Sequence, residues 1–589
     1  MKTKQSLLLL LSCFGLSTSL ASCGNNGPTI RSVAIVTTDG TGEVKRTEDG
    51  FHLLFKKDSE IPYVSIEEGF AFLNAVKAAR LSDAKNEKYY FHLKEEGETY
   101  VAVDEANNKV TFDVANQTIT YTDFDDFLSF QDNNYKPLNL IGIQPTAKSL
   151  KVVSSNFKKG QAVTVDLKPY ASIDLFTHEG KGYLPLDTFN DLFYNVFENA
   201  NLAYNYKDVY WIPNESLTVT LFGTAMLSSL GEAFYNVPQR KALSEELINF
   251  NLQELSLNFD NFYGLKKNKN LASFASLVEE KGFKSDFTSS DPYVVDSALR
   301  LVLTYLNDGH TALSLSSFFF PFGEAKEDDS RYNPTHKKWE LDGNQFQKSR
   351  KGSASPLGNH FDTTSGTYTI AFDSFHEINE NILYGRDELP DGASIDSDTA
   401  YQFAMAYDYL SSAEAKTSVK QVVVDLSTND GGSADSLMYA LCTILGKVTT
   451  HTKNPVSGAE NETVFAADLN RDGQIDDADK GLVEMGYRVG VLSSEYTFSC
   501  GNALPAIAKD NNPNIITAGE TSGGGACVLR TCMDPIGQTY SLSGLTQICS
   551  KKGDQLVDVD GGVSADVAIA KDSMFDPTKV GTLIGSYKK

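Results

Sequence analysis

The sequence is poor in cysteine, in proline and in positive charge. Seven Cys in 589 residues are too few for a disulfide-stabilised scaffold, although a bridge among Cys527, Cys532 and Cys549 stays open. Eighteen Pro and 44 Gly exclude collagen-like and proline-rich classes. Against 77 Asp and Glu there are 52 Lys and Arg, so the net charge of −25 disfavours a nucleic-acid partner. The 41% of hydrophobic residues is instead enough for large folded domains.

The first residues have the layout of an export signal. A positively charged start precedes an apolar stretch at 6–14, which is too short to span a bilayer, and small residues then lead to Cys23. Small residues directly before a Cys resemble a bacterial lipobox. The resemblance implies that the signal at 1–22 is removed and that Cys23 carries a lipid. We therefore expect a protein anchored to the extracellular face of a membrane, in a Gram-positive bacterium, with 23–30 as a tether. No later segment contains 18 consecutive apolar residues, so we expect no transmembrane helix.

Residues 31–220 are predicted to form a β-rich α+β region. Apolar and polar residues alternate in several short segments, as half-buried strands require. Residues 63–73 and 183–193 also match each other, each reading as a strand that enters a helix, which indicates two related lobes. This pattern resembles the N-terminal domain of copper amine oxidases, without metal ligands here. The resemblance implies a stalk or a binding module.

The remainder divides into three parts. Residues 225–316 have helical spacing at 242–262 and 292–306, with Asp291 as cap and Pro292 in the first turn, and are expected to be a helical cap-like segment. Residues 317–364 are polar and are predicted to be an irregular insertion or lid. Residues 365–589 alternate strands and helices, which indicates an α/β core with a largely parallel sheet. The expected strands are 367–372, 422–426, 489–492 and 515–518, and the expected helices are 398–413, 433–446 and 499–509.

Four motifs in the second half carry candidate chemistry. His310 follows an amphipathic helix, Gly431-Gly432 ends an apolar strand, Ser499 precedes a helix, and a glycine-rich loop at 519–525 is followed by acids at 558–566. Each motif also has a purely structural interpretation. The His can be structural, the Gly-Gly an ordinary turn, Ser499 an N-cap, and the acids part of a solvated loop. A glycine turn and a helix N-terminus both offer N–H groups to a developing negative charge.

In this order the four motifs, across residues 230–575, resemble the S41 serine peptidases, the tail-specific, tricorn-core and retinoid-binding-protein-like group. The resemblance implies a ClpP/crotonase-like α/β core and a serine-type endopeptidase acting on peptides or proteins without a catalytic cofactor. It assigns Ser499 as nucleophile and His310 as general base. It places the oxyanion at backbone N–H groups of Gly431, Gly432 and Cys500.

The third catalytic member is the least defined. Tail-specific members use a Lys about 25 residues after the Ser, where this chain has glycines 523–525, so a Ser–His–acid arrangement is expected. The family usually has Glu three residues before a Gly-Val pair. Here Val559 stands there, between Asp558 and Asp560, with Asp560 slightly favoured. This departure leaves an alternative open, a catalytically weak or inactive S41-like surface binding protein.

A further motif predicts a structural Ca²⁺ site. Residues 468–479 fit the EF-hand loop, with a Gly at the sharp turn and an Asp at the last ligand position, which resembles a dockerin loop. The expected ligands are Asp468, Asn470, Asp472, Gln474 through its carbonyl, Asp476 and Asp479. Dockerins use two such loops to bind a cohesin, whereas this chain shows one. A stabilising role is therefore favoured over a cohesin-like partner.

Overall fold

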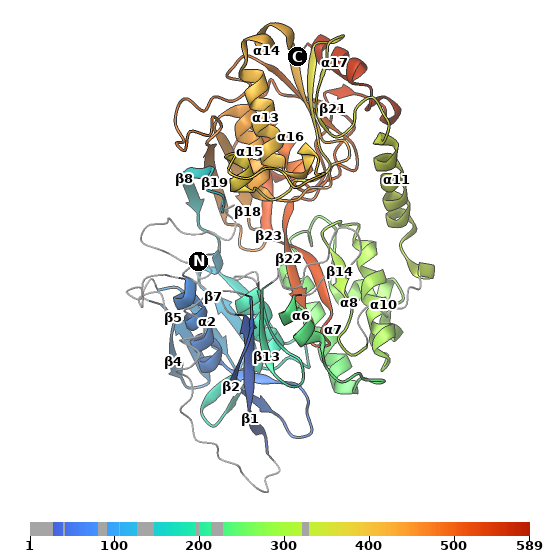
Figure 1. Ribbon diagram of the computed structural model, residues 1–589. Coiled ribbons are helices and arrows are strands. Elements are labelled where there is room, and N and C mark those ends of the chain that lie inside the picture. The colour runs from blue at the N-terminus through green and yellow to red at the C-terminus, as the bar shows by residue number, and fades with distance from the viewer. Residues whose placement is uncertain are drawn as a thin grey trace.

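The computed structural model describes residues 27–38, 42–80, 91–104, 107–125, 146–195, 200–213, 228–320 and 329–588. The proposed signal and Cys23 lie outside these residues. Two lobes are stacked in Figure 1, with the N-terminal strands and several helices below and an α/β layer structure above. Among the described helices, none combines the length and the apolar character needed to cross a bilayer.

The N-terminal region is β-rich, as its alternating sequence predicts, and it contains two sheets. One has the order β10-β11-β3-β2-β1-β13-β12, and the other is an antiparallel sheet in the order β4-β5-β6-β7-β9. Both repeated segments run from strand to helix, and their strands β3 and β11 pair antiparallel, with Val64 opposite Leu184. The two repeats therefore meet inside one sheet. The strands are β1 (Thr29–Thr38), β2 (Val44–Phe55), β3 (Tyr63–Ser65), β4 (His92–Glu96), β5 (Thr99–Val103), β6 (Lys109–Asp113), β7 (Thr118–Tyr121), β9 (Val163–Asp166), β10 (Phe176–His178), β11 (Lys181–Pro185), β12 (Ala200–Tyr204) and β13 (Val209–Pro213), and the helices are α2 (Ile66–Arg80), α4 (Leu186–Phe189) and the π-helix η4 (Asn190–Tyr194).

Helices fill residues 229–306, in agreement with the predicted helical segment. Asp291 accepts the Tyr293 N–H at 3.0 Å and Pro292 occupies the first turn of α10, so the predicted helix start is confirmed. A short 3-10 helix, η6 (Thr304–Leu306), ends the segment, and the chain then turns through His310 into β14 (Ala312–Leu315). The helices are α6 (Ser229–Tyr235), α7 (Glu245–Phe262), α8 (Phe274–Glu280), α9 (Lys284–Phe287) and α10 (Pro292–Leu303).

The upper lobe has the predicted, largely parallel sheet. Its order is β15-β16-β17-β20-β21-β25, and only β15 runs antiparallel to its neighbour. The predicted strands and helices of this lobe agree closely with the observed bounds. The strands are β15 (Gly358–Asp362), β16 (Thr367–Ala371), β17 (Gln421–Asp425), β20 (Arg488–Ser493), β21 (Ile516–Gly519) and β25 (Val567–Ala568), and the helices are α12 (Glu380–Leu383), α13 (Thr399–Ser411), α14 (Ala413–Ser418), α15 (Ala434–Leu445), α16 (Cys500–Asn511) and α17 (Pro577–Ser586), with 3-10 turns η8 (Ile395–Ser397) and η9 (Lys571–Ser573).

The expectation of an irregular segment at 317–364 was wrong. After the 3-10 turn η7 (Asp329–Arg331), helix α11 (Pro334–Arg350) runs along one side of the molecule in Figure 1. Only Phe346 and Arg350 of this helix are buried, so its sequence lacks the apolar period that predicts a helix. Trp339 and Phe346 pack on Tyr496, with ring centroids 5.9 and 5.6 Å apart.

A fourth sheet, which the sequence did not predict, joins the two lobes. Its order is β14-β23-β18-β19-β8, and β22 and β24 pair with β23 as well. Strand β8 comes from the N-terminal region and pairs with β19, so residues 31–220 are not separate from the core. The strands are β8 (Leu150–Lys158), β18 (Val448–Lys453), β19 (Glu460–Ala467), β22 (Cys527–Met533), β23 (Thr539–Lys552) and β24 (Gln555–Asp558).

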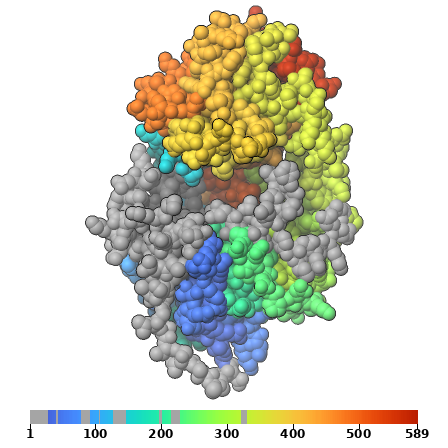
Figure 2. Space-filling view, viewed as in Figure 1, coloured from blue at the N-terminus to red at the C-terminus, as the bar shows by residue number. Residues whose placement is uncertain are grey.

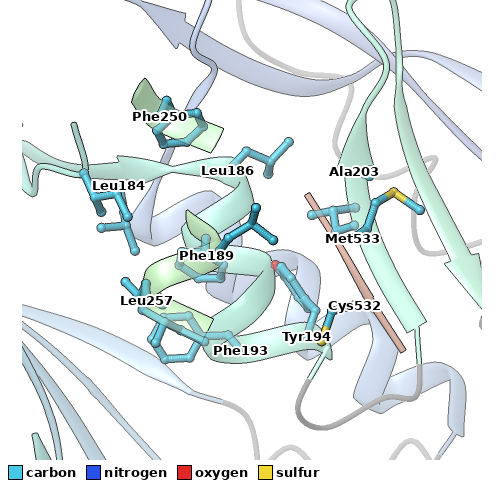
Figure 3. Close-up of a cluster of buried hydrophobic side chains, with 14 of the residues drawn as sticks. Leu184, Leu186, Phe189, Phe193, Tyr194, Ala203, Phe250, Leu257, Cys532 and Met533 are labelled. Carbon is cyan, nitrogen blue, oxygen red and sulfur yellow. The ribbon is translucent and has the colours of Figure 1, made fainter. Parts of the chain in front are cut away.

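One apolar core extends from the N-terminal lobe through the helices to β22 and β23. Figure 3 shows Cys532 of β22 beside Tyr194 of the N-terminal lobe and Met533 beside Ala203. The described residues contain no disulfide, and all of their cysteines are buried. These are Cys442, Cys500, Cys527, Cys532 and Cys549. Packing rather than bridges holds the lobes together.

Gly264→Ala is expected to destabilise this connection. Gly264 follows α7 and donates its N–H to the Ser543 carbonyl of β23 at 2.8 Å, and an added Cβ would stand 2.0 Å from the Gly544 carbonyl oxygen. Overpacking against rigid backbone should lower the free energy of unfolding by about 3 kcal/mol, measured by urea denaturation. Gly27→Ala is the control, because nothing lies within 4 Å of its added Cβ. Equal stability of the two variants would contradict the prediction.

Candidate active site

Ser499 occupies a sharp corner between the β20 segment and α16. Its backbone has φ 55° and ψ −122°, a left-handed conformation that costs energy for a residue other than glycine. The Ser499 N–H donates to the Gly524 carbonyl at 2.9 Å, and its side chain makes no capping hydrogen bond. The N-cap interpretation therefore does not hold. Strain of this kind is typical of functional sites.

The Gly431-Gly432 turn lies directly against this corner. A Cβ added to Gly431 would stand 2.5 Å from the Ser499 Cβ, so only glycine permits the approach. The Gly431 N–H is already donated to Asn429 Oδ1 at 3.0 Å, which removes it as an oxyanion donor. In the described chain, the N–H groups of Gly432 and Cys500 donate to no backbone carbonyl. These two are the donors that remain for an oxyanion.

The side chain of Cys500 also belongs to this turn. Its thiol donates to the Gly432 carbonyl oxygen at 3.1 Å and is in contact with the Ser499 hydroxyl. Burial raises the pKa of the Cys500 thiol to about 12, and the carboxylate of Glu377 adds to the shift. The thiol therefore stays protonated and does not compete with Ser499 as a nucleophile.

His310 reaches the same corner from the lower lobe. Its ring packs edge-on against Phe498, the residue before Ser499, with centroids 4.8 Å apart. Burial lowers the pKa of His310 below its usual 6.5, while the charges of Asp308 and Asp560 oppose that shift. Its Nδ1 is buried without a hydrogen-bond partner in the described structure. A neutral, buried imidazole is suited to accept a proton.

The two candidate acids differ in their surroundings. Asp560 accepts the Gly525 N–H at 3.3 Å and pairs with Lys269 Nζ at 3.3 Å, and its charge acts on His310. Asp558 instead accepts the Asn268 amide at 2.9 Å and the Asp560 N–H at 3.1 Å. Within the described residues, no hydrogen bond joins His310 to either acid or to Ser499. Asp560 is therefore a better candidate than Asp558 for the acid that orients His310.

Sequence reasoning missed two residues of the site. Asp308 is buried and accepts the Thr311 hydroxyl at 2.6 Å, the Tyr263 hydroxyl at 3.1 Å and the His310 N–H at 3.1 Å, so it fixes the turn that carries the imidazole. Its position two residues before His310 was the available signal. Lys269 donates to the Asn307 carbonyl at 3.0 Å and pairs with Asp560. It lies in a lysine-rich turn that gives no hint of this contact.

The loop at 468–479 has the backbone-to-carboxylate hydrogen bonds of an EF-hand loop. Asp468 Oδ2 accepts the Gly473 N–H at 2.8 Å, and Asp479 accepts the N–H groups of Leu469 and Asp476 at 2.8 and 2.9 Å. The second oxygen of Asp468, Oδ1, is buried without a partner among the described residues. Burial raises the pKa of Asp468, and the charges of Asp479 and Asp472 raise it further.

The same loop departs from an EF-hand in its flanks. Strand β19 rather than a helix enters it, and turns rather than a helix follow it. Across the described ranges, no three His, Cys, Asp or Glu side chains converge closely enough to hold a metal ion. The donor set still fits Ca²⁺, because Asp468, Asn470, Asp472, Asp476 and Asp479 supply hard oxygen atoms and the Gln474 carbonyl is at the usual position.

Several solved structures are similar to this chain at low identity. A Parabacteroides merdae protein described as a candidate peptidase is 17% identical, covering 56% of this chain and 94% of its own, with a TM-score of 0.38. Mature CPAF in complex with lactacystin is 10% identical, covering 57% and 97%, with a TM-score of 0.37. A lipoprotein from Streptococcus agalactiae is 13% identical, covering 59% and 98%, with a TM-score of 0.34. These TM-scores are too low to carry an argument.

No curated protein sequence matches the chain. Residues 375–549, however, match peptidase family S41. This range includes the Gly431-Gly432 turn, Ser499 and Cys500, whereas His310 and Asp560 lie outside it. The chain thus carries a peptidase S41 domain of mixed α/β structure behind a β-rich N-terminal portion, and it is a serine peptidase hydrolase.

Proposed function

We propose that this serine peptidase cleaves peptide bonds with Ser499 as nucleophile and His310 as general base. One observation carries the proposal: the strained Ser499 corner lies against Gly431, while the neutral His310 ring packs on the adjacent Phe498. Two glycines allow the backbone to pass close to the Phe498 ring. An added Cβ would stand 2.9 Å from this ring at Gly309 and 2.8 Å from it at Gly525. The finer architecture is proposed to be ClpP/crotonase-like.

The chemistry follows from these positions. The Ser499 hydroxyl attacks the peptide carbonyl carbon as His310 accepts its proton, and the carbonyl oxygen gains the negative charge. The N–H groups of Gly432 and Cys500 stabilise that charge, and loss of such a donor typically costs about 3 kcal/mol of barrier. His310 then protonates the leaving amine. Water, deprotonated by His310, hydrolyses the ester and restores the Ser499 hydroxyl.

Asp560 is proposed to orient His310, because Nδ1 is buried and lacks a partner while the charge of Asp560 acts on it. The ion pair with Lys269 competes for the same carboxylate. A carboxylate held by Lys269 is less available to orient His310. The ion pair therefore favours a second candidate function, a catalytically weak or inactive surface protein that binds a ligand. An Asp is also shorter than the Glu expected at this position, so it reaches less far.

We also propose lipid anchoring through Cys23 and an extracellular location. The support is the order of positive charge, apolar stretch, small residues and Cys in the first 23 residues. The N-terminal region, residues 31–220, would then act as a stalk or a ligand-binding region between the membrane and the site. Peptides or proteins outside the cell would be the substrates.

Ser499→Ala should abolish cleavage of a mixed peptide library, read by mass spectrometry, with a loss of at least about 10³-fold. The matched control is Ser285→Ala on α9, where the serine is exposed. Both variants should keep the wild-type melting temperature. Cleavage that survives in Ser499→Ala would overturn the assignment. Folded wild type that cleaves nothing would support the binding-protein alternative.

The pH profile of kcat/KM should rise to a plateau governed by a pKa below 6.5, because the buried His310 must be neutral to accept a proton. The charge of Asp560 raises the pKa of His310, so Asp560→Asn should move the acidic limb to lower pH as well as lower the rate. Asp558→Asn is the paired control and should leave the limb in place. A limb that moves only in the Asp558 variant would reverse the assignment of the acid.

We further propose that the 468–479 loop binds one structural Ca²⁺, as a clip within the domain rather than a cohesin-docking module. The support is the unpartnered, buried Asp468 oxygen within an EF-hand pattern of loop hydrogen bonds. Tyr384 donates its hydroxyl to Asp468 Oδ2 at 2.8 Å, so the loop is tied to the end of α12. Bound Ca²⁺ would hold this part of the upper lobe together.

Added Ca²⁺ should raise the melting temperature of the wild type by several degrees, since ligand at 100 times its Kd stabilises by about 2.7 kcal/mol. Asp468→Asn should lose that shift, and calorimetric titration should show its binding weakened. Asp477→Asn is the control, because that carboxylate occupies a non-ligand position and is fully exposed. An identical Ca²⁺ response in all three proteins, or none in the wild type, contradicts the site.

A further inference from the structure

A cavity of about 700 Å³ adjoins the proposed oxyanion turn. The Phe375 N–H donates to the Gly431 carbonyl at 2.6 Å and its carbonyl accepts the Ser433 N–H at 2.7 Å, so Phe375 is fixed to the turn on both sides. The cavity lining begins with the next two residues, His376 and Glu377. In Figure 2 the gold segment of the upper lobe that contains these residues overhangs the hollow between the lobes.

The cavity combines an apolar wall with a carboxylate rim. Its apolar surface is formed by Ile378, Ile382, Leu389, Pro390 and Ala393. Two of its acids already have structural roles. Glu380 accepts the Ser149 N–H and hydroxyl, both at 3.0 Å, and Asp398 accepts the Tyr401 N–H at the start of α13 at 3.0 Å.

Glu377 is the acid that remains for a ligand. Its side chain is exposed, accepts the Ser433 hydroxyl at 3.2 Å through Oε2, and pairs with no cation in the described part of the chain. Ser433 directly follows Gly432, so this hydrogen bond places the Glu377 carboxylate beside the proposed oxyanion turn. Asp373 and Asp430 also lie beside this turn, where the Asp430 N–H donates to the Asp373 carbonyl at 3.0 Å, and burial raises the pKa of the Asp430 carboxyl to about 6.

We propose that this cavity is a substrate subsite that takes the side chain of a Lys or Arg residue next to the scissile bond. Such a side chain has an apolar stem for the isoleucine and proline wall and a cationic head for Glu377. The chain's net charge of −25 would also favour basic peptides over acidic ones. The proposal rests on the proposed peptidase function and names the substrate class for the same site.

Binding to the Ser499→Ala variant tests the subsite without requiring catalysis. Three peptides that differ at one position, with Arg, Gln or Glu, are titrated by fluorescence anisotropy. We expect the Arg peptide to bind at least tenfold more tightly than the Gln peptide, and the Glu peptide most weakly. Adding Glu377→Gln should bring the Arg and Gln peptides to within about twofold. Adding Glu414→Gln, an exposed acid on α14, should preserve the difference.

The outcomes separate the two proposals. Equal binding of Arg and Gln peptides to Ser499→Ala, or a preference that survives Glu377→Gln, overturns the basic subsite even where the wild type cleaves peptides. Preference for Arg that depends on Glu377 supports the subsite even where the wild type cleaves nothing, and in that case only the peptidase proposal fails. Circular dichroism of each variant confirms that the fold is retained.

Discussion

Strand β23 brings together segments that are hundreds of residues apart in the sequence. Its ladder pairs Ala312 with Ser541, Gln547 with Cys527, and Cys549 with Asp558. His310 lies just before the first of these contacts, Gly525 just before the second and Asp560 just after the third. Because β-sheet register fixes each segment along the strand, one ladder positions the base, the glycine loop beneath Ser499 and the candidate acid. The nucleophile itself comes from the neighbouring parallel sheet.

The sequence predicted elements whose information is local. The strand and helix order of the upper lobe, the cap at Asp291, and the turns at Gly431-Gly432 and Ser499 all follow from periodicity and turn chemistry. Helix α11 was missed because only Phe346 and Arg350 are buried, so no apolar stripe marks it. The joining sheet was missed because pairing between β8 and β19, or between β14 and β23, depends on partners distant in sequence.

The same distinction applies to the site. Ser499, His310 and the glycine turn could be named from motifs, but the partners of each acid could not. Lys269 pairs with Asp560 only because the turn after α7 packs against the end of β24, and no local pattern encodes that contact. Likewise, the Gly431 N–H looked available in sequence, and only the structure shows Asn429 occupying it. Which acceptor pairs with a given backbone N–H can be assigned only from the tertiary structure.

The position of β23 near the end of the chain has a consequence for biosynthesis. A ribosome that has made residues 1–530 has already produced His310, Ser499 and the glycine loop that ends at Gly525. The strand that positions the His310 segment and the glycine loop, Thr539–Lys552, does not yet exist. The lower lobe's apolar core also lacks its β23 residues, Tyr540, Leu542 and Leu545, until then. The nascent chain at this stage can pair β8 with β19, but it lacks the central strand of the joining sheet, so the alignment of His310 with the glycine loop is delayed until synthesis is nearly complete. The site is therefore completed only after residues 539–552 have been made.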